Sequence, residues 1–447
     1  MDAVVMVLSL VIALSIVVFV HELGHLVAAK RSKVVVGEFG FGYPPRLFAF
    51  WRSAGQVVIG GNRIVIPRGF ELPKGVQARS LVLYETITDK KGRQVLTHIE
   101  EVTAPLAGDE DRPVTTGPVT AGQVSASSVD FLDPGTLFSF NAIPFGGFCQ
   151  MLGEEDPTFP GSLASKSKLT RILVLSAGAG MNLLTAVLFF SLALRLGAPA
   201  LAEPQNAVVN SAAPGSPAEA AGLQPGDVIL WADGREILAI TDLQEHTQAH
   251  LGEAVELTVR RGSPELEGET LEITVVPRVK PPEGEGPMGI SLTPRTTVKE
   301  YPWHEAIWLG MKQTIGYIGL IITIPVQVIK GMVPAELARP VGPIGVGRLV
   351  GDAVQFSLDT GWWFPVMQMM GTLSVALAVT NLLPLPGLDG GRILFVLVEG
   401  IRGRRLDPAK EGLVHLVGML LLVALMLFIT WQDVVNPVQS LDWSSFF

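Results

Sequence analysis

The sequence contains very little cysteine and little charge. Cys149 is the only cysteine among 447 residues, so no disulfide can form within the chain, and we expect Cys149 to be a small core residue. Charged residues make up 17% of the chain and hydrophobic residues 48%, which is too apolar for an ordinary soluble protein. The net charge of −9 at pH 7 provides no basic surface for nucleic acid. The composition therefore predicts a membrane protein with at least one soluble domain.

Lysine and arginine are absent before Lys30 and again after Lys410. Residues 3–20 carry no charge and, with the motif that follows them, are long enough to span a bilayer. No basic segment precedes this run and no small-residue cleavage site follows it, so we expect a retained span rather than a signal peptide. The positive-inside rule places both termini outside and the end of the first span near the cytoplasmic face.

Three further uncharged runs predict spans, which gives four transmembrane helices in all. They are residues 172–194, a stretch within 360–388 that the segment Pro384-Leu-Pro-Gly387 divides, and roughly residues 412–432. Residues 303–330 are also apolar, but a span there would place the basic loop after residue 400 outside, against the positive-inside rule. We therefore predict an interfacial amphipathic helix on the outer face for 303–330.

The first span ends in the motif His21-Glu22-Leu23-Gly24-His25, which has the H-E-x-x-H pattern. On a helix, His21 and His25 lie on one face and can bind one zinc ion together, with Glu22 beside them as a general base. The alternative is two structural histidines and a carboxylate at a helix end. Uncompensated polar groups at membrane depth cost several kcal/mol, which favours the metal site.

A zinc hydrolase needs a third protein ligand and one open position. The candidate is Asp389, the first charge after Asp359, in Asn381-Leu-Leu-Pro-Leu-Pro-Gly-Leu-Asp389-Gly-Gly. These two motifs together resemble the site-2 protease family of intramembrane zinc metalloproteases. The bacterial regulator-of-sigma-E protease type is the most similar branch, because a PDZ-like segment lies between the motifs.

That PDZ-like segment covers residues 203–280 and includes Pro214-Gly-Ser-Pro-Ala-Glu-Ala-Ala-Gly-Leu-Gln-Pro-Gly-Asp227. A PDZ domain takes an extended peptide at a sheet edge. One copy is visible, whereas the enterobacterial type has two. His246 and His250 also have i, i+4 spacing, but no Glu follows His246, and we interpret this stretch as an exposed helix of the domain rather than a metal site.

Two aromatic, glycine-punctuated segments, Phe39-Gly-Phe-Gly-Tyr43 and residues 138–148, are predicted to be β-structure. The resemblance implies a β-hairpin that dips into the membrane beside the zinc; the alternative is an ordinary cytosolic hairpin. Between them, the positive-inside rule makes residues 53–138 a cytosolic insert. Residues 80–102 alternate like a hairpin with its turn at Asp89–Gly92, and 103–130 have the composition of a loop.

The predicted fold is an α-helical membrane protein with four transmembrane helices, a membrane-dipping β-hairpin, a cytosolic β-rich insert and an extracytoplasmic PDZ domain, an α+β chain. The segments are the first helix with the start of the hairpin (1–52), the insert (53–138) and the rest of the hairpin with the second helix (139–200). They continue with the PDZ domain (203–280), a linker with the interfacial helix (281–359) and the last two helices (360–447).

The resemblance implies a zinc endopeptidase of the bacterial cytoplasmic membrane that cleaves transmembrane segments, such as those of anti-sigma factors or remnant signal peptides. Zn²⁺ is the expected cofactor, held by His21, His25 and Asp389, with Glu22 as the general base. Asn381 is the first candidate to bind the substrate backbone. Asn182, in the second span, is the second candidate, and an interhelical hydrogen bond is its alternative role. His415 is assigned no metal role.

Two other functions are compatible with the residues alone. The first is a membrane scaffold that uses its PDZ domain and has lost catalysis, although the intact Glu22 and Asp389 argue against it. The second is a different membrane zincin, such as a prenyl-protein protease, in which the third ligand is normally a glutamate and no PDZ domain is expected. The expected partners are transmembrane protein substrates, membrane lipid and an extended peptide, and no nucleic acid.

Overall fold

The computed structural model describes residues 3–73, 75–102, 125–152, 157–159, 161–262, 268–334, 338–405, 407–439, 441 and 443. Most of the segment 103–130, which we expect to be a loop, lies outside these residues. The chain forms two compact units, one from residues 1–191 and 307–441 and the other from residues 192–306 and 442–447. Each unit is described below by itself.

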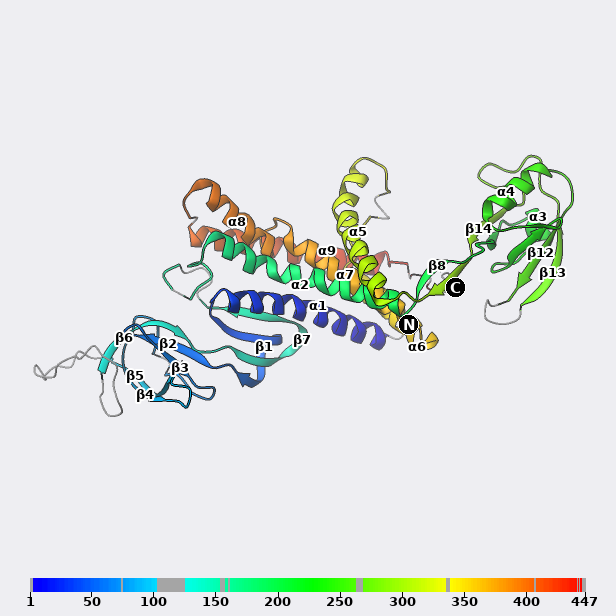
Figure 1. Ribbon diagram of the computed structural model, residues 1–447. Coiled ribbons are helices and arrows are strands. Elements are labelled where there is room, and N and C mark those ends of the chain that lie inside the picture. The colour runs from blue at the N-terminus through cyan, green and yellow to red at the C-terminus, as the bar shows by residue number, and fades with distance from the viewer. Residues whose placement is uncertain are drawn as a thin grey trace, which may run out of the picture. The chain divides into compact units, whose positions relative to one another are not determined.

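Long apolar helices dominate the first unit. Within the described residues, five helices are long and apolar enough to cross a membrane: α1 (Ala3–Arg31), α2 (Lys168–Arg195), α5 (Trp303–Ile329), α7 (Phe364–Leu382) and α9 (Pro408–Val435). Four of them, α1, α2, α7 and α9, coincide with the predicted spans and run alongside one another in Figure 1. The chain is thus a multi-pass membrane protein of mixed helix and sheet content.

The fifth apolar helix, α5, runs at a steep angle to α2 in Figure 1. Its Tyr317 ring stacks on Phe190 of α2 at 5.3 Å, and Gln313 hydrogen-bonds Gln368 of α7 at 3.0 Å. The helix continues through Pro325, although proline usually interrupts one. By length and composition, α5 meets the same criteria for a membrane span as the other four helices.

Two shorter helices complete this unit. Helix α6 (Pro343–Thr360), which was not predicted, packs against α1, where Gly347 faces Met6 and Leu10. Helix α8 (Asp389–Arg402) begins after the break at Pro384 and Pro386, where proline removes backbone donors and ends α7 at Leu382. Helix α8 leads from this break to the basic segment after residue 400.

Helices α1 and α2 approach each other closely because Gly24 has no side chain. A Cβ at position 24 would lie 2.4 Å from the carbonyl oxygen of Ala177. A buried cluster beside this contact joins α1, α2, α8 and two long strands, β1 (Val36–Arg52) and β7 (Leu137–Met151). Its members are Leu26, Ala28, Ala29, Val34, Val36, Phe39, Met151, Leu163, Val174, Leu175 and Val396, and the partly buried Cys149 packs against them.

Strands β1 and β7 pair as a two-stranded sheet, as the aromatic segments predict. The first part of β1 pairs with both ends of β7: Phe39 is opposite both Cys149 and Phe138. The second part of β1 pairs only with the beginning of β7, as in Trp51 opposite Phe138. The turn of β7 is fastened to α1, because the hydroxyl of Ser15 donates to the Pro144 carbonyl at 3.0 Å and accepts from the Gly146 amide at 3.3 Å.

The insert between β1 and β7 is a closed five-stranded barrel in the order β2-β3-β5-β4-β6, and its closure was not predicted. Its strands are β2 (Gly55–Ile59), β3 (Asn62–Ile66), β4 (Leu81–Thr88), β5 (Gln94–Glu101) and β6 (Ser125–Asp133). Alternate apolar residues such as Val57, Ile64 and Leu96 fill its interior. The hairpin predicted for 80–102 is confirmed: β4 and β5 are antiparallel and Asp89 accepts the amide of Lys91 in the turn.

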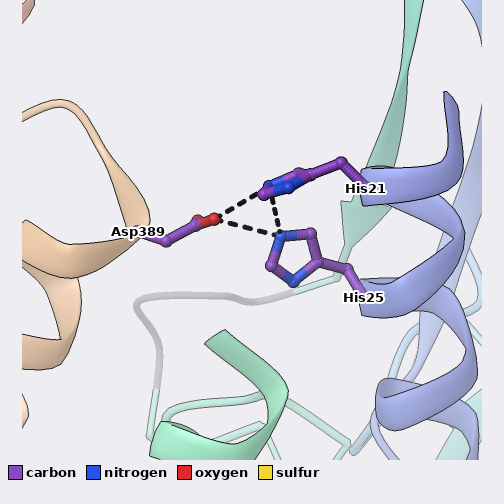
Figure 2. Close-up of side chains that lie close together, drawn as sticks. All are labelled: His21, His25 and Asp389. Carbon is purple, nitrogen blue, oxygen red and sulfur yellow. Dashed lines mark hydrogen bonds and ion pairs between the residues drawn. The ribbon is translucent and has the colours of Figure 1, made fainter. Parts of the chain in front are cut away.

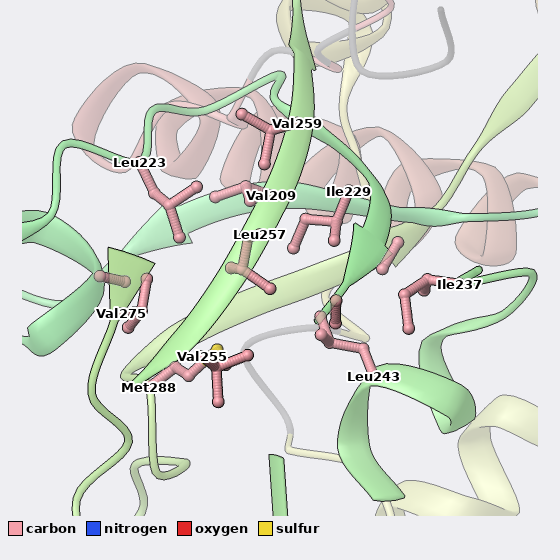
Figure 3. Packing of buried hydrophobic residues seen from close by; sticks show 13 residues of the cluster. Val209, Leu223, Ile229, Ile237, Leu243, Val255, Leu257, Val259, Val275 and Met288 are labelled. Carbon is pink, nitrogen blue, oxygen red and sulfur yellow. The ribbon is translucent and has the colours of Figure 1, made fainter. Parts of the chain in front are cut away.

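The second unit is built on one sheet in the order β13-β12-β10-β9-β14, with β11 paired to β10. Its elements are β9 (Ala207–Ala212), α3 (Pro217–Ala220), β10 (Val228–Ala232), β11 (Arg235–Glu236), α4 (Ile240–Ala249), β12 (Val255–Arg261), β13 (Glu269–Val275) and β14 (Ile290–Pro294). Figure 3 shows the aliphatic core that packs helix and sheet together, centred on Ile229, Leu243 and Leu257. A separate ribbon pairs β8 (Ala198–Leu201) with β15 (Thr296–Lys299).

Candidate metal centre

Three side chains from opposite ends of the sequence converge in the first unit (Figure 2). Nε2 of His21 lies 3.0 Å and Nε2 of His25 lies 3.2 Å from Oδ2 of Asp389, and the two nitrogens are 3.2 Å apart. A tetrahedral zinc ion with bonds of about 2.0–2.1 Å separates its ligand atoms by about 3.3–3.4 Å. The three atoms therefore form a triangle of the size that one such ion requires.

The far nitrogen of each histidine faces a polar group. Nδ1 of His25 lies 2.9 Å from the carbonyl oxygen of Val174, so this nitrogen carries the proton and Nε2 keeps its lone pair. Nδ1 of His21 lies 3.3 Å from the side-chain amide of Asn182, which is fully buried. These contacts orient both Nε2 atoms toward Asp389, as outer groups do at metal sites.

The amide of Asn182 also tests whether a metal fits. Among the described residues, its Oδ1 is buried without a hydrogen-bond partner. Amide oxygen and nitrogen are assigned from the hydrogen-bond network, and exchanging them would let Oδ1 accept a hydrogen bond from Nδ1–H of His21. That exchange would leave Nε2 of His21 unprotonated. Three electron-rich atoms would then face one another, an arrangement that a cation between them stabilises.

Glycine makes room at the same point. Gly178 of α2 faces the histidines, and a Cβ there would lie 2.5 Å from Nε2 of His25 and 2.6 Å from Nε2 of His21. The absence of a side chain at Gly178 therefore leaves space beside the two ligand nitrogens. Gly180 lies two residues further along α2 and faces open space, since no atom lies within 4 Å of the position its Cβ would take.

Glu22 follows His21 on α1 and is partly buried. Its carboxylate interacts electrostatically with His21, His25 and Asp389, and the backbone of Cys149 in β7 forms a hydrogen bond to it. Glu22 is therefore beside the three-residue cluster without belonging to it. An ionisable carboxylate in this position can accept a proton from a molecule bound at the cluster.

Tight backbone packing holds Asp389 in place. A Cβ at Gly390 would lie 2.1 Å from the carbonyl oxygen of Leu383, and a Cβ at Gly391 would lie 2.3 Å from that of Leu385. The two glycines after Asp389 thus let the start of α8 fold against the proline-containing break. His415 of α9 contributes as well, because its Nδ1 accepts the amide of Gly387 at 3.0 Å. The sequence analysis gave His415 no such structural role.

The two asparagines predicted to bind substrate have different surroundings. Asn182 contacts His21, and its backbone carbonyl accepts the hydroxyl of Ser374 at 2.9 Å, so it links α2 to α1 and α7. Asn381 lies in the last turn of α7 and is partly exposed. Within the described part of the chain it forms no hydrogen bond to His21, His25 or Asp389.

A second set of possible metal ligands lies in the other unit, where Asp233 joins His246 and His250. The sequence analysis interpreted the two histidines as belonging to an exposed helix. The helix is confirmed as α4, but His246 is buried, so its predicted exposure is wrong. Asp233 follows β10, outside the helix that carries the histidine spacing, so that spacing does not indicate it as a partner of the histidines.

Comparison with known proteins agrees with the geometry. Residues 9–59 and 123–425 match the profile of "Peptidase family M50". The chain is 28% identical over 442 residues to "Zinc metalloprotease RasP" of Geobacillus kaustophilus, covering 96% of this chain and 97% of the relative. It is 26% identical over 439 residues to "Regulator of sigma-W protease RasP" of Bacillus subtilis, covering 96% and 98%.

A third relative is more similar over a shorter region. A putative zinc metalloprotease of Clostridium perfringens is 34% identical over 306 residues, which cover 68% of this chain and 85% of the relative. The family match agrees with the resemblance inferred from the two motifs, and it favours a protease over a scaffold or a prenyl-protein protease. The chain belongs to peptidase family M50, the site-2 protease family, and is a zinc metalloprotease.

Proposed function

We propose that this protease hydrolyses transmembrane segments of membrane proteins, with His21, His25 and Asp389 as its zinc ligands and Glu22 as its general base. The convergence of the three ligand atoms within 3.2 Å of one another, among helices apolar enough to span, is the observation that carries the proposal. The direct test is cleavage of a transmembrane peptide by the purified protein in detergent, with the products identified by mass spectrometry.

Zinc bound there would polarise the scissile carbonyl and lower the pKa of a coordinated water. Glu22 would take the proton of the attacking water and then donate it to the leaving amine. Asn182 would hold His21 in the required orientation, which makes it a positioning residue. Asn381 would contact the substrate backbone at the end of α7.

A transmembrane helix hides its carbonyl groups in its own hydrogen bonds, so it must unwind before it can be cleaved. The β1–β7 sheet beside α1 is suited to binding an unwound segment along a strand edge. Its exposed aromatic and aliphatic side chains would contact apolar substrate; they include Tyr43, Phe48, Phe50, Phe140, Ile143 and Phe145. We propose that this sheet is the hairpin that dips into the membrane.

The second unit is proposed to be the PDZ domain. Strand β14 lies at the edge of its sheet, and a cavity of about 400 Å³ between α4 and β14 is lined by residues that include Leu243, Thr247, Met288 and Ile290. An extended peptide could pair with the free edge of β14 and place side chains in this cavity. The sheet includes β14 and so extends beyond the boundary of residue 280 that the sequence analysis placed.

We propose that the substrates are single-span proteins whose outer domains have already been removed, as in regulated proteolysis. The printed name of the Bacillus subtilis relative, a regulator of sigma-W protease, supports an anti-sigma-factor-like substrate. Remnant signal peptides share the relevant chemistry, a single apolar helix without a large outer domain. We place the protein in the bacterial cytoplasmic membrane.

The proposed topology has four spans, with both termini and the second unit outside and the barrel inside. In this arrangement α5 lies on the outer face. In a Cys149→Ser background, Glu253→Cys in the second unit and Lys330→Cys after α5 should react with an impermeant thiol reagent in intact cells. Lys90→Cys, in the exposed β4–β5 turn, should react only after lysis. Protection of Lys330→Cys would instead make α5 a fifth span.

We expect the second unit to exclude substrates that still carry bulky outer domains. Removing residues 203–294 would preserve the β8–β15 ribbon, in which Leu201 pairs with Thr296, so the two ends could be joined by a short linker. The truncated enzyme should cleave full-length substrates and keep its activity on truncated ones. If it folds but loses activity on truncated substrates, the unit serves for docking or support instead of exclusion.

Gly178 offers a test of the space beside the ligands. Gly178→Ala should lower zinc affinity by about 10–100-fold, the scale seen when groups around metal ligands are disturbed. Its Cβ would lie within 2.7 Å of His21 and His25 atoms, whereas Gly180→Ala meets no atom within 4 Å and is the matched control. Zinc binding measured by chelator competition should distinguish the two variants. Equal affinities would show that Gly178 is not beside the metal.

A further inference from the structure

A cluster of metal-binding side chains lies in the second unit, apart from the zinc site described above. Asp233 occupies the turn between β10 and β11, His246 lies in α4, and His250 follows the end of that helix. One possible ligand atom from each of the three residues lies within 4.8 Å of the other two. Nε2 of His246 and Oδ2 of Asp233 are 2.7 Å apart, and the two imidazole rings have centroids 4.3 Å apart.

Backbone groups already form hydrogen bonds to two of these side chains, in each case at an atom that would not bind the metal. Oδ1 of Asp233 accepts the amide of Glu256 at 2.8 Å, which leaves Oδ2 directed at His246. Nδ1 of His250 lies 2.9 Å from the carbonyl oxygen of His246 and therefore donates to it, which leaves the lone pair of Nε2 available. Metal-bound histidines and carboxylates are commonly oriented by such outer hydrogen bonds.

We propose that Asp233, His246 and His250 form a second binding site for a divalent transition metal such as Zn²⁺. Two imidazoles and one carboxylate are ligands that zinc prefers, and His250, at the C-cap of α4, places its ring centroid 4.3 Å from that of His246, near enough for both to bind one ion. The His246 side chain is 9% exposed and that of Asp233 34%, so the site is anchored in the domain yet open to water at its fourth position.

An ion pair between Asp233 and His246 would account for only part of this arrangement. It needs a single histidine, and it does not by itself account for the imidazole of His250, which lies tilted at 32° beside that of His246. Zinc would accommodate all three groups, with a small adjustment, because ligand atoms around a tetrahedral ion lie about 3.3–3.4 Å apart and two of these atoms are now 2.7 Å apart.

The site has a structural consequence for the cavity on the other side of α4. Leu243, Gln244, Thr247 and Gln248 of this helix line the cavity between α4 and β14. An ion bound by His246, His250 and Asp233 would tie α4 to the β10–β11 turn and hold that wall in place. Metal occupancy would therefore stabilise the surface that we propose for an extended peptide, and this consequence alone depends on the proposed function.

Metal counting on the full-length, tag-free protein tests the site independently of proteolysis. At saturating zinc, the wild type should hold one more zinc ion per chain than His250→Ala or Asp233→Ala. His304→Ala removes an exposed histidine of the same unit, with a side chain 81% exposed, and should bind as much zinc as the wild type. Asp389→Ala combined with His250→Ala should lose both ions.

A thermal measurement provides the second readout. Zinc should raise the unfolding temperature of Asp389→Ala, in which only the proposed second site remains, and should not do so after His250→Ala is added. His250→Gln preserves size without supplying an imidazole and guards against a variant that fails to fold. Equal zinc content in the wild type, His250→Ala and His250→Gln would overturn the proposal and leave an Asp233–His246 ion pair only.

Discussion

Glu22→Gln should leave the zinc content of the protein at the wild-type value and abolish almost all of its proteolytic activity. Glutamine keeps the size of the side chain but cannot accept a proton. Loss of general acid–base catalysis together with poorer activation of water should lower the cleavage rate by roughly 10³-fold or more. The carboxylate is close to the ligand cluster but outside its triangle, so metal binding should persist.

The assay for this variant is cleavage of a transmembrane peptide in detergent, with zinc counted on the same sample. Glu399→Gln changes a buried carboxylate of α8 that pairs with Arg171 of α2, and serves as a control for the general effect of removing a buried carboxylate. Near-normal cleavage by Glu22→Gln would show that another group is the base. Loss of zinc would instead make Glu22 a ligand.

Asp389→Ala should remove one zinc ion per chain and lower activity to the background level. Its Oδ2 lies within 3.2 Å of the ligand nitrogens of His21 and His25, although 368 and 364 residues of sequence separate these partners. Without the carboxylate, two imidazoles remain, which is one fewer protein ligand than catalytic zinc sites have. His21→Ala and His25→Ala should cause the same loss.

The matched control for this loss is Asp359→Ala, which removes an exposed carboxylate near the end of α6. Far-ultraviolet circular dichroism spectra should verify that helix content is preserved in every variant. If Asp389→Ala retained its full zinc content, the third ligand would have to come from another residue. Joint loss of zinc in all three variants would tie the first and last thirds of the chain to one site.

The sequence was most informative where a local pattern determines the structure. Uncharged runs identified α1, α2, α7 and α9, because a spanning helix must be apolar along its length. Prolines at 384 and 386 identified the break before α8. The spacing of His21 and His25 placed them on one helix face, but spacing alone could not bring Asp389 to them. That pairing came from the resemblance of both motifs to one family.

Features that depend on distant parts of the chain were not predicted. The barrel closes because β2 pairs with β6, and no pattern within either strand predicts that pairing. Asp233 reaches His246 across the fold of the second unit, so the helical spacing of the histidines gave no sign of it. His415 accepts the amide of Gly387, 28 residues earlier in the chain, and no local pattern indicates that contact. Such contacts are set by tertiary structure rather than by local propensity.

The central claim, that residue 389 contacts the same zinc ion as His21 and His25, is tested most directly by Asp389→Cys in a Cys149→Ser background. This variant contains one sulfur that can bind zinc as a thiolate, and X-ray absorption at the zinc edge detects a Zn–S bond of about 2.3 Å. We predict a sulfur in the zinc shell of Asp389→Cys and none in Asn381→Cys. An Asp389→Cys protein that holds as much zinc as the wild type, with only nitrogen and oxygen ligands, would contradict the claim.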